Sequence, residues 1–133
     1  IKLPTRSDGR SAGYDFYTPV DIILQPGERK LVWTDVKAYM QNNEVLMLYV
    51  RSSIGVKKGV VLANGTGIID VSYYSNLDND SRIGIALYNT SNDRVTINAG
   101  ERVAQGIFMQ YLTADDDNVL NKTRAGGFGS SGK

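Results

Sequence analysis

Short hydrophobic segments rich in Val, Ile, Leu and Tyr alternate along this chain with polar stretches that contain Gly, Pro, Asn and Asp. Apolar segments of this length, bounded by turn residues, are typical of an all-β sandwich or barrel. No long stretch has the period of an amphipathic helix. The pattern therefore predicts an all-β fold, with strands at residues 20–24, 30–39, 45–50, 60–62, 67–70, 83–88, 95–97 and 103–112.

Polar clusters between these segments predict the turns. Four of them, at residues 25–28, 41–43, 91–93 and 98–101, are rich in the residue types that hairpins and corners require. Only one place favours a helix, because Ser52 and Ser53 can cap a short turn that runs toward Lys58 and ends at Gly59. We expect at most one short helix.

The pattern changes after residue 114. Residues 115–117 are consecutive aspartates, and the end of the chain is rich in glycine with a single aromatic residue. Such a segment buries too little apolar surface to order itself. The aspartates lack the ligand spacing of an EF-hand, which favours a solvated loop over a metal site. We therefore expect a folded core at 1–114 and a flexible C-terminal arm at 115–133.

Length and composition agree with one domain. The chain has 133 residues, of which 41% are hydrophobic and 22% charged. Its net charge of +1 does not indicate a basic surface that would bind nucleic acid. No apolar run approaches the roughly 18 to 20 residues of a membrane-spanning helix, and no secretory signal pattern is present. We expect a cytoplasmic protein with neither a membrane nor a direct nucleic-acid partner.

The chain contains no Cys and no His. Thiolate nucleophiles, disulfides and Cys-ligated metals are therefore excluded, and the usual general base near neutral pH is missing. Acid–base chemistry must come from Asp, Glu, Lys, Tyr or a metal-bound water.

Two segments carry groups that suit phosphate. Arg51, Ser52 and Ser53 follow an apolar strand, where hydroxyls and amides at a helix start can bind an anion. In the arm, Arg124 and Phe128 offer a guanidinium and a stacking ring among glycines. The alternatives are a helix cap for the first segment and a flexible linker for the second.

The leading candidate base is Asp70, which ends an apolar strand. A carboxylate there is costly unless it is hydrogen-bonded or functional, although an Asp that caps a turn is an equal alternative. The preceding Asn64 and Gly65 predict a tight hairpin whose backbone can read the edge of a base. Asp15 lies between aromatic residues, and Gln105 lies within an apolar strand.

Five segments in this order resemble the motifs of the trimeric dUTPases, and the resemblance covers essentially the whole chain. It implies a distorted jelly-roll of the β-clip type, a homotrimer with three shared active sites, and Mg²⁺-dependent cleavage of dUTP to dUMP and pyrophosphate. The segments are 11–16, 51–53 with Gly59, 64–73, 100–105, and Arg124 with 126–132.

The resemblance also implies a role for each site residue. Asp70 would activate the water that attacks the α-phosphorus, and Tyr73 would pack under the sugar. Asp15 would contact Mg²⁺ through water. Arg51 would support Asp70 or the nearby phosphates. The uracil pocket would be lined by Asn64, Gly67 and Ile69, phosphates would be bound by Ser52, Ser53 and Gln105, and the arm would close with Arg124, Phe128, Gly129 and Ser130.

The chain departs from the family pattern after Tyr73, where the family commonly continues Arg-Gly-Glu and this chain has Tyr74, Ser75 and Asn76. Such variants resemble phage and Gram-positive bacterial members. One alternative is the related dCTP deaminase, but Ala86 stands where that enzyme needs a glutamate. Another is a nucleotide-responsive binding protein that engages a protein regulator, and a third is a structural jelly-roll, which leaves the phosphate-type residues unexplained.

Overall fold

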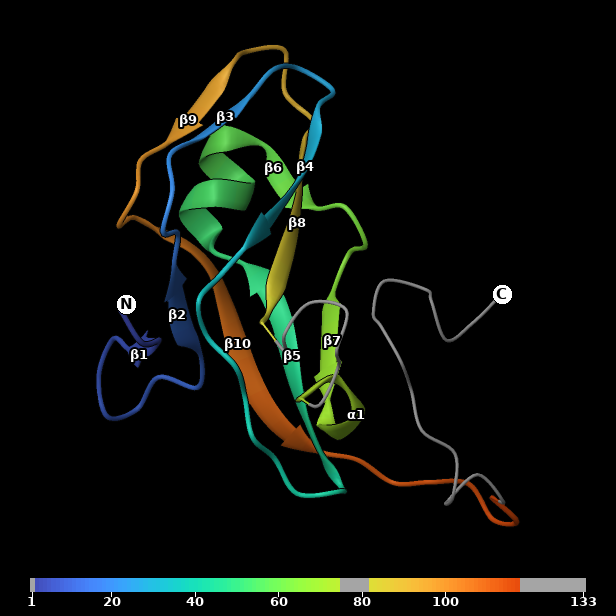
Figure 1. The fold of residues 1–133 in the computed structure, drawn as a ribbon. Helices are drawn as coiled ribbons and strands as arrows, with labels where there is room; N and C mark the ends of the chain where they lie inside the picture. Colours follow the sequence, from blue (N-terminus) through green and yellow to red (C-terminus); the bar gives the residue numbers. More distant parts are fainter. Residues whose placement is uncertain (1, 75–81, 118–133) are drawn as a thin grey trace.

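Ten strands form three antiparallel sheets in the computed structural model, which describes residues 2–74 and 82–117 (Figure 1). Two short helical segments, η1 (Ser53–Lys57) and α1 (Val71–Tyr74), complete the described elements. The strands are β1 (Thr5–Arg6), β2 (Tyr14–Tyr17), β3 (Ile22–Leu24), β4 (Arg29–Trp33), β5 (Glu44–Val50), β6 (Val60–Leu62), β7 (Gly67–Asp70), β8 (Gly84–Asn89), β9 (Val95–Ile97) and β10 (Arg102–Gln110).

The sheets have the orders β1-β2-β10-β5-β7, β3-β9 and β4-β8-β6. In the five-stranded sheet β10 pairs with both β2 and β5, so its residues hold segments together that are far apart in sequence. Strand β7 lies at the edge of this sheet and pairs only with β5 among the described strands. All-β organisation in antiparallel sheets confirms the predicted fold class.

The core lies between the sheets, because side chains alternate in direction along each strand. On β5, Leu46 and Leu48 are buried, and they face a core that includes Ile85 and Leu87 of β8 and Ile97 of β9. The opposite face of the five-stranded sheet carries Met47 and Ile68, which pair across β5 and β7. Ile68 is 58% exposed, so part of this outer face is apolar and open in a single chain.

The predicted bounds of β6, β7 and β9 are confirmed, and β3, β5, β8 and β10 differ by one or two residues. The prediction for 30–39 is wrong beyond Trp33, because pairing with β8 ends there and the Thr34 hydroxyl donates to the Ile83 carbonyl, 2.7 Å away. Strands β1 and β2 were not predicted. The expectation of at most one short helix is wrong, because a second helical turn, α1, follows β7 directly.

The predicted helix after Arg51 is present as η1 and ends before Gly59, whose φ of 69° suits glycine. No helix in the described residues is long and apolar enough to cross a membrane. The expected boundary at residue 114 stays a prediction. Arg124, Phe128, Gly129 and Ser130 lie outside the described residues, as do Ser75 and Asn76.

A fully buried amide ties the ends of β3 and β8 to the following turn. Asn89 Nδ2 donates to the carbonyls of Leu24 (3.0 Å) and Asp93 (2.8 Å), and its Oδ1 accepts from the backbone N–H (2.9 Å) and the hydroxyl (2.7 Å) of Ser91. Each bond satisfies a group that water cannot reach easily, so the network specifies this corner.

We predict that Asn89→Ala lowers the free energy of unfolding by about 2–4 kcal/mol, because it removes the amide donor to the carbonyl of the buried Leu24 and leaves a cavity at a fully buried position. Asn92→Ala, at an exposed position in the same turn, should change it by about 0.5 kcal/mol or less. Chemical denaturation at one fixed protein concentration measures both, and equal effects would contradict the proposed role of the network.

Candidate functional site

The register of the five-stranded sheet brings three predicted site residues together. Gln105 of β10 pairs with Asp15 of β2 on one side and with Tyr49 of β5 on the other. Arg51 follows β5 directly, two residues beyond Tyr49. Gln105 Nε2 lies 3.4 Å from the Val50 carbonyl, which places the glutamine amide beside the start of η1.

Gly13 allows Gln105 this position. A Cβ atom at residue 13 would lie 2.6 Å from Gln105 Oε1, well inside the contact distance of real side chains. A side chain at residue 13 would therefore displace the Gln105 amide from this position.

Asp15 is the charged centre of the cluster. Its side chain is 9% exposed, and its two carboxylate oxygens contact different guanidinium groups. Arg51 Nε lies 3.2 Å from Oδ1, and Arg102 Nη1 lies 3.5 Å from Oδ2. The Ser7 hydroxyl donates to Oδ2 at 3.4 Å. A buried carboxylate needs such partners, because its desolvation is otherwise unfavourable.

Arg102 reaches this cluster through an irregularity in β10. The register between β10 and β2 shifts between Arg102 and Ala104, and both Val103 and Ala104 are fully buried. Two consecutive inward residues mark a bulge, which lets Arg102 and Gln105 lie on the same side although their spacing is odd. The sequence pattern does not single out Arg102 as a site residue.

An open pocket of about 580 Å³ lies beside this cluster. Its walls carry the cationic side chains of Lys2, Arg51, Lys58 and Arg102 and only one acidic side chain, Glu101. Ser53 also lines it, and its Oγ lies 3.2 Å from Arg51 Nη1. Guanidinium, ammonium and hydroxyl groups at such density favour an anion with several oxygens, such as a phosphate chain. We call this the cationic pocket.

Ser52 does not act as the predicted helix cap. It occupies the N-cap position of η1, but its side chain makes no capping hydrogen bond and the residue is exposed. Ser52 is therefore exposed, and it lies in the chain between Arg51 and Ser53, which both line the cationic pocket.

The remaining predicted site residues of the described chain lie on β7, on α1 and in the turn before β7. Asp70 ends β7 and is partly buried, and the Ser72 hydroxyl donates to its Oδ1 at 2.7 Å. Tyr73 is 2% exposed and its hydroxyl donates to the Arg82 carbonyl at 2.9 Å. Gly67 and Ile69 are buried where β7 contacts β5, and Asn64 is exposed in the preceding turn.

These two groups lie at opposite ends of β5. Asp70 pairs with Val45, whereas Arg51 follows the other end of the strand, and Figure 1 shows α1 and η1 at those two ends. Six residues of strand and one strand spacing separate Asp70 from Arg51 by about 20 Å. A single copy of the chain therefore does not place the candidate base beside the cationic pocket.

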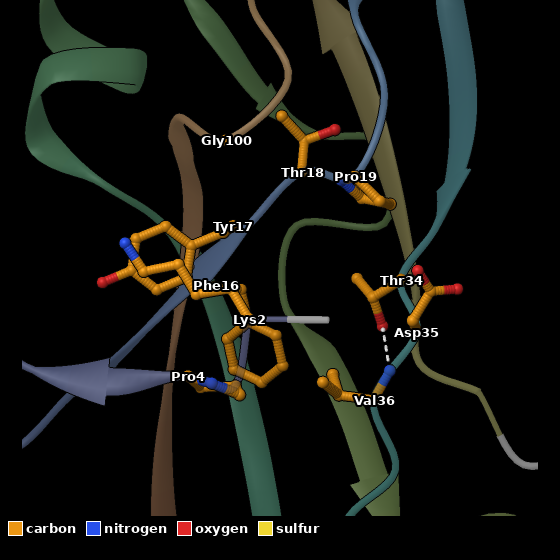
Figure 2. Close-up of a pocket in the computed structure, with 10 residues that line it drawn as sticks. All are labelled: Lys2, Pro4, Phe16, Tyr17, Thr18, Pro19, Thr34, Asp35, Val36 and Gly100. Atoms are coloured by element: carbon orange, nitrogen blue, oxygen red, sulfur yellow. Dashed lines mark hydrogen bonds between the residues drawn. The ribbon is translucent and has the colours of Figure 1, made fainter.

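A second pocket, of about 350 Å³, adjoins the cationic pocket and shares Lys2, Tyr17 and Gly100 with it (Figure 2). The Lys2 ammonium lies 4.0 Å from the centre of the Tyr17 ring. The two buried hydroxyls in its wall donate to backbone carbonyls, Thr18 to Val20 and Thr34 to Ile83. Asp70 does not line this pocket, and the two buried hydroxyls in its wall are already engaged with the backbone.

The comparisons with known proteins identify the family. The dUTPase family model matches residues 1–132. The chain is 48% identical to the deoxyuridine 5′-triphosphate nucleotidohydrolase of Lactococcus lactis over 99% of this chain and 89% of that protein. It is 34% identical to the Haemophilus influenzae protein of the same name, over 98% of this chain and 87% of that one. The crystal structure of the Streptococcus mutans dUTPase superposes with a TM-score of 0.80 at 45% identity, over 85% of this chain and 88% of that one.

We predict that inorganic pyrophosphate raises the thermal unfolding temperature of the protein, because the cationic pocket binds it. Arg51→Gln should remove most of this shift, since it deletes a charge-assisted donor. Lys37→Gln removes the same charge from an exposed position outside the pocket and serves as the control. Equal shifts in both variants, measured by scanning fluorimetry, would place the anion elsewhere.

Proposed function

The chain belongs to the dUTPase family, and we propose that Asp70 and the cationic pocket have separate roles in its activity, the cleavage of dUTP to dUMP and pyrophosphate. The pocket binds the triphosphate, and Asp70 accepts a proton from the water that attacks the α-phosphorus. The bond from that phosphorus to the bridging oxygen of the β-phosphate breaks, and pyrophosphate leaves. The charge of the cationic pocket is the observation that supports this proposal.

The proposal requires more than one copy of the chain. The α- and γ-phosphorus atoms of a triphosphate are linked through only two bridging oxygens and the β-phosphorus. This phosphate chain is too short to span the about 20 Å between Asp70 and Arg51 of one copy. We propose a homotrimer in which Asp70 of one copy faces the cationic pocket of another. The outer face of the five-stranded sheet suits such packing, because Ile68 and Met109 are exposed there beside Met47 and Ile107.

Strand β7 is proposed to read the base. As an edge strand it presents alternate backbone N–H and C=O groups away from β5, and these can pair with the edge of uracil. Asn64, Gly67 and Ile69 lie along this segment. Tyr73 is 2% exposed and its hydroxyl donates to the Arg82 carbonyl, so its ring is buried in the single chain and its packing under the sugar stays a prediction.

The phosphates are proposed to contact Arg51, Ser52, Ser53 and Gln105, with further cover from Arg124, Phe128, Gly129 and Ser130 of the arm. A lid from the arm would exclude water once the substrate is bound. The contacts from the arm rest on the resemblance alone.

The described residues do not fit a resident Mg²⁺ ion. They contain no group of three or more acidic side chains that could hold a metal, and both oxygens of Asp15 contact guanidiniums. Mg²⁺ in nucleotide sites takes its ligands largely from phosphates and water. We propose that it arrives as part of the Mg²⁺–dUTP substrate, where it offsets the charge of the triphosphate. The predicted contact from Asp15 through water stays a prediction.

We predict that the protein with Mg²⁺ releases pyrophosphate from dUTP and not from dTTP, dCTP or UTP. Asp70→Asn should lower the rate by about 10²- to 10⁴-fold, as expected for loss of a general base. Asp35→Asn, which removes an exposed carboxylate outside this site, should retain the wild-type rate. A wild-type rate in Asp70→Asn would exclude Asp70 as the base, and equal cleavage of dCTP or UTP would contradict the proposed reading of base and sugar.

A further inference from the structure

The carboxylate of Asp70 needs one defined orientation if it is to accept a proton from the water that attacks phosphorus. Asp70 is the last residue of β7, so the strand fixes where its Cα and Cβ atoms lie. The χ2 torsion of an aspartate is broad, and the backbone therefore does not determine how the plane of the carboxylate is turned. A hydrogen-bond donor beside the carboxylate must set that plane.

Ser72 supplies such a donor. Its hydroxyl lies 2.7 Å from Asp70 Oδ1 and donates to it. Hydrogen bonds from a hydroxyl to an ionised carboxylate belong to the short, strong class. A carboxylate has about four lone-pair positions, so a bond at Oδ1 leaves capacity to accept from a water molecule.

The position of Ser72 is itself fixed by its two neighbours in the turn α1. Val71 packs against the hydrophobic core. Tyr73 is buried, and its hydroxyl donates to the Arg82 carbonyl. Ser72 lies between these two anchored residues and is exposed, so its hydroxyl is available to Asp70 from a defined point. The turn that follows β7 is therefore a rigid support for the candidate base.

We propose that Ser72 is a positioning residue whose hydroxyl orients the Asp70 carboxylate toward the attacking water. The proposal rests on the proposed function, in which Asp70 is the general base. Ser72 acts through Asp70 Oδ1 and contacts neither the phosphates nor the leaving pyrophosphate. In the proposed homotrimer the bound substrate excludes water from this hydrogen bond, which strengthens it.

A purely structural role for Ser72 in the turn predicts a different result. Alanine has a higher helix propensity than serine, so Ser72→Ala would keep or strengthen α1. The side chain is exposed, and its removal therefore leaves no cavity. Positioning instead predicts slower chemistry in a protein that is as stable as the wild type. Ser72→Thr is the matched variant, because it keeps a hydroxyl at the same position.

The chemical step is measured in a single turnover, with the protein in excess over Mg²⁺–dUTP. We expect Ser72→Ala to lower the rate of pyrophosphate formation by about 10- to 50-fold, because the base is no longer held in its orientation. Ser72→Thr should keep most of the wild-type rate. Sedimentation and thermal unfolding show that both variants have the wild-type assembly and fold.

Substrate binding should not change. By calorimetry, the dissociation constant of the non-hydrolysable α,β-imido analogue of dUTP should stay within about twofold of the wild-type value in Ser72→Ala. Binding that is weaker by about tenfold or more would show that Ser72 holds the substrate itself and would overturn the proposal.

A double-mutant cycle tests whether the hydroxyl acts through the base. Asparagine at residue 70 cannot take the proton, so adding Ser72→Ala to Asp70→Asn should change the remaining rate by less than about twofold. A full further loss in the double variant would overturn the proposed coupling, and so would equal losses in Ser72→Ala and Ser72→Thr.

The same measurements separate this inference from the proposed function. A wild-type rate in Asp70→Asn would remove Asp70 as the base, and the role of Ser72 with it. A slow Asp70→Asn variant together with a wild-type rate in Ser72→Ala would remove only this inference.

Discussion

The double pairing of β10 is the constraint on which the candidate site depends. By hydrogen-bonding to β2 on one side and β5 on the other, this strand sets Gln105 level with Asp15 and close to the start of η1. A slip of one residue in either pairing would turn Gln105 into the core and separate Asp15 from Arg51. The bulge between Arg102 and Ala104 adds the second guanidinium, so the backbone of this strand places both Gln105 and one of the four cationic side chains of the pocket.

The same sheet keeps the candidate base away from that charge. Asp70 pairs with Val45 at one end of β5, and Arg51 follows the other end, so neither local rearrangement nor side-chain rotation joins them. Chemistry that needs both must use a second copy, which ties activity to assembly. The exposed apolar side chains on the outer face of this sheet are consistent with that requirement.

Much of the fold was predictable because the strands with strong apolar patterns are also the central ones. β6, β7 and β9 have the expected bounds, and Asp70 ends its strand as expected. Strand β2 was missed because Asp15 interrupts its apolar pattern, and that aspartate is buried only because two arginines from distant positions pair with it. The alternation of apolar and polar residues could not identify Arg102, because the direction of its side chain depends on the bulge in β10. The five motifs give candidate segments, but the distance between Asp70 and Arg51 became apparent only from the strand register.

Mixing two inactive variants tests the divided site most directly. Asp70→Asn and Arg51→Gln subunits, co-expressed with different tags and purified for both, should recover dUTP cleavage to about a third of the wild-type rate, because each cyclic trimer that contains both variants has one of its three sites complete. If Asp70 and Arg51 of one copy formed the site, every site in the mixed assembly would keep one defect. Mixed assemblies that remain as inactive as the two parents would contradict this account.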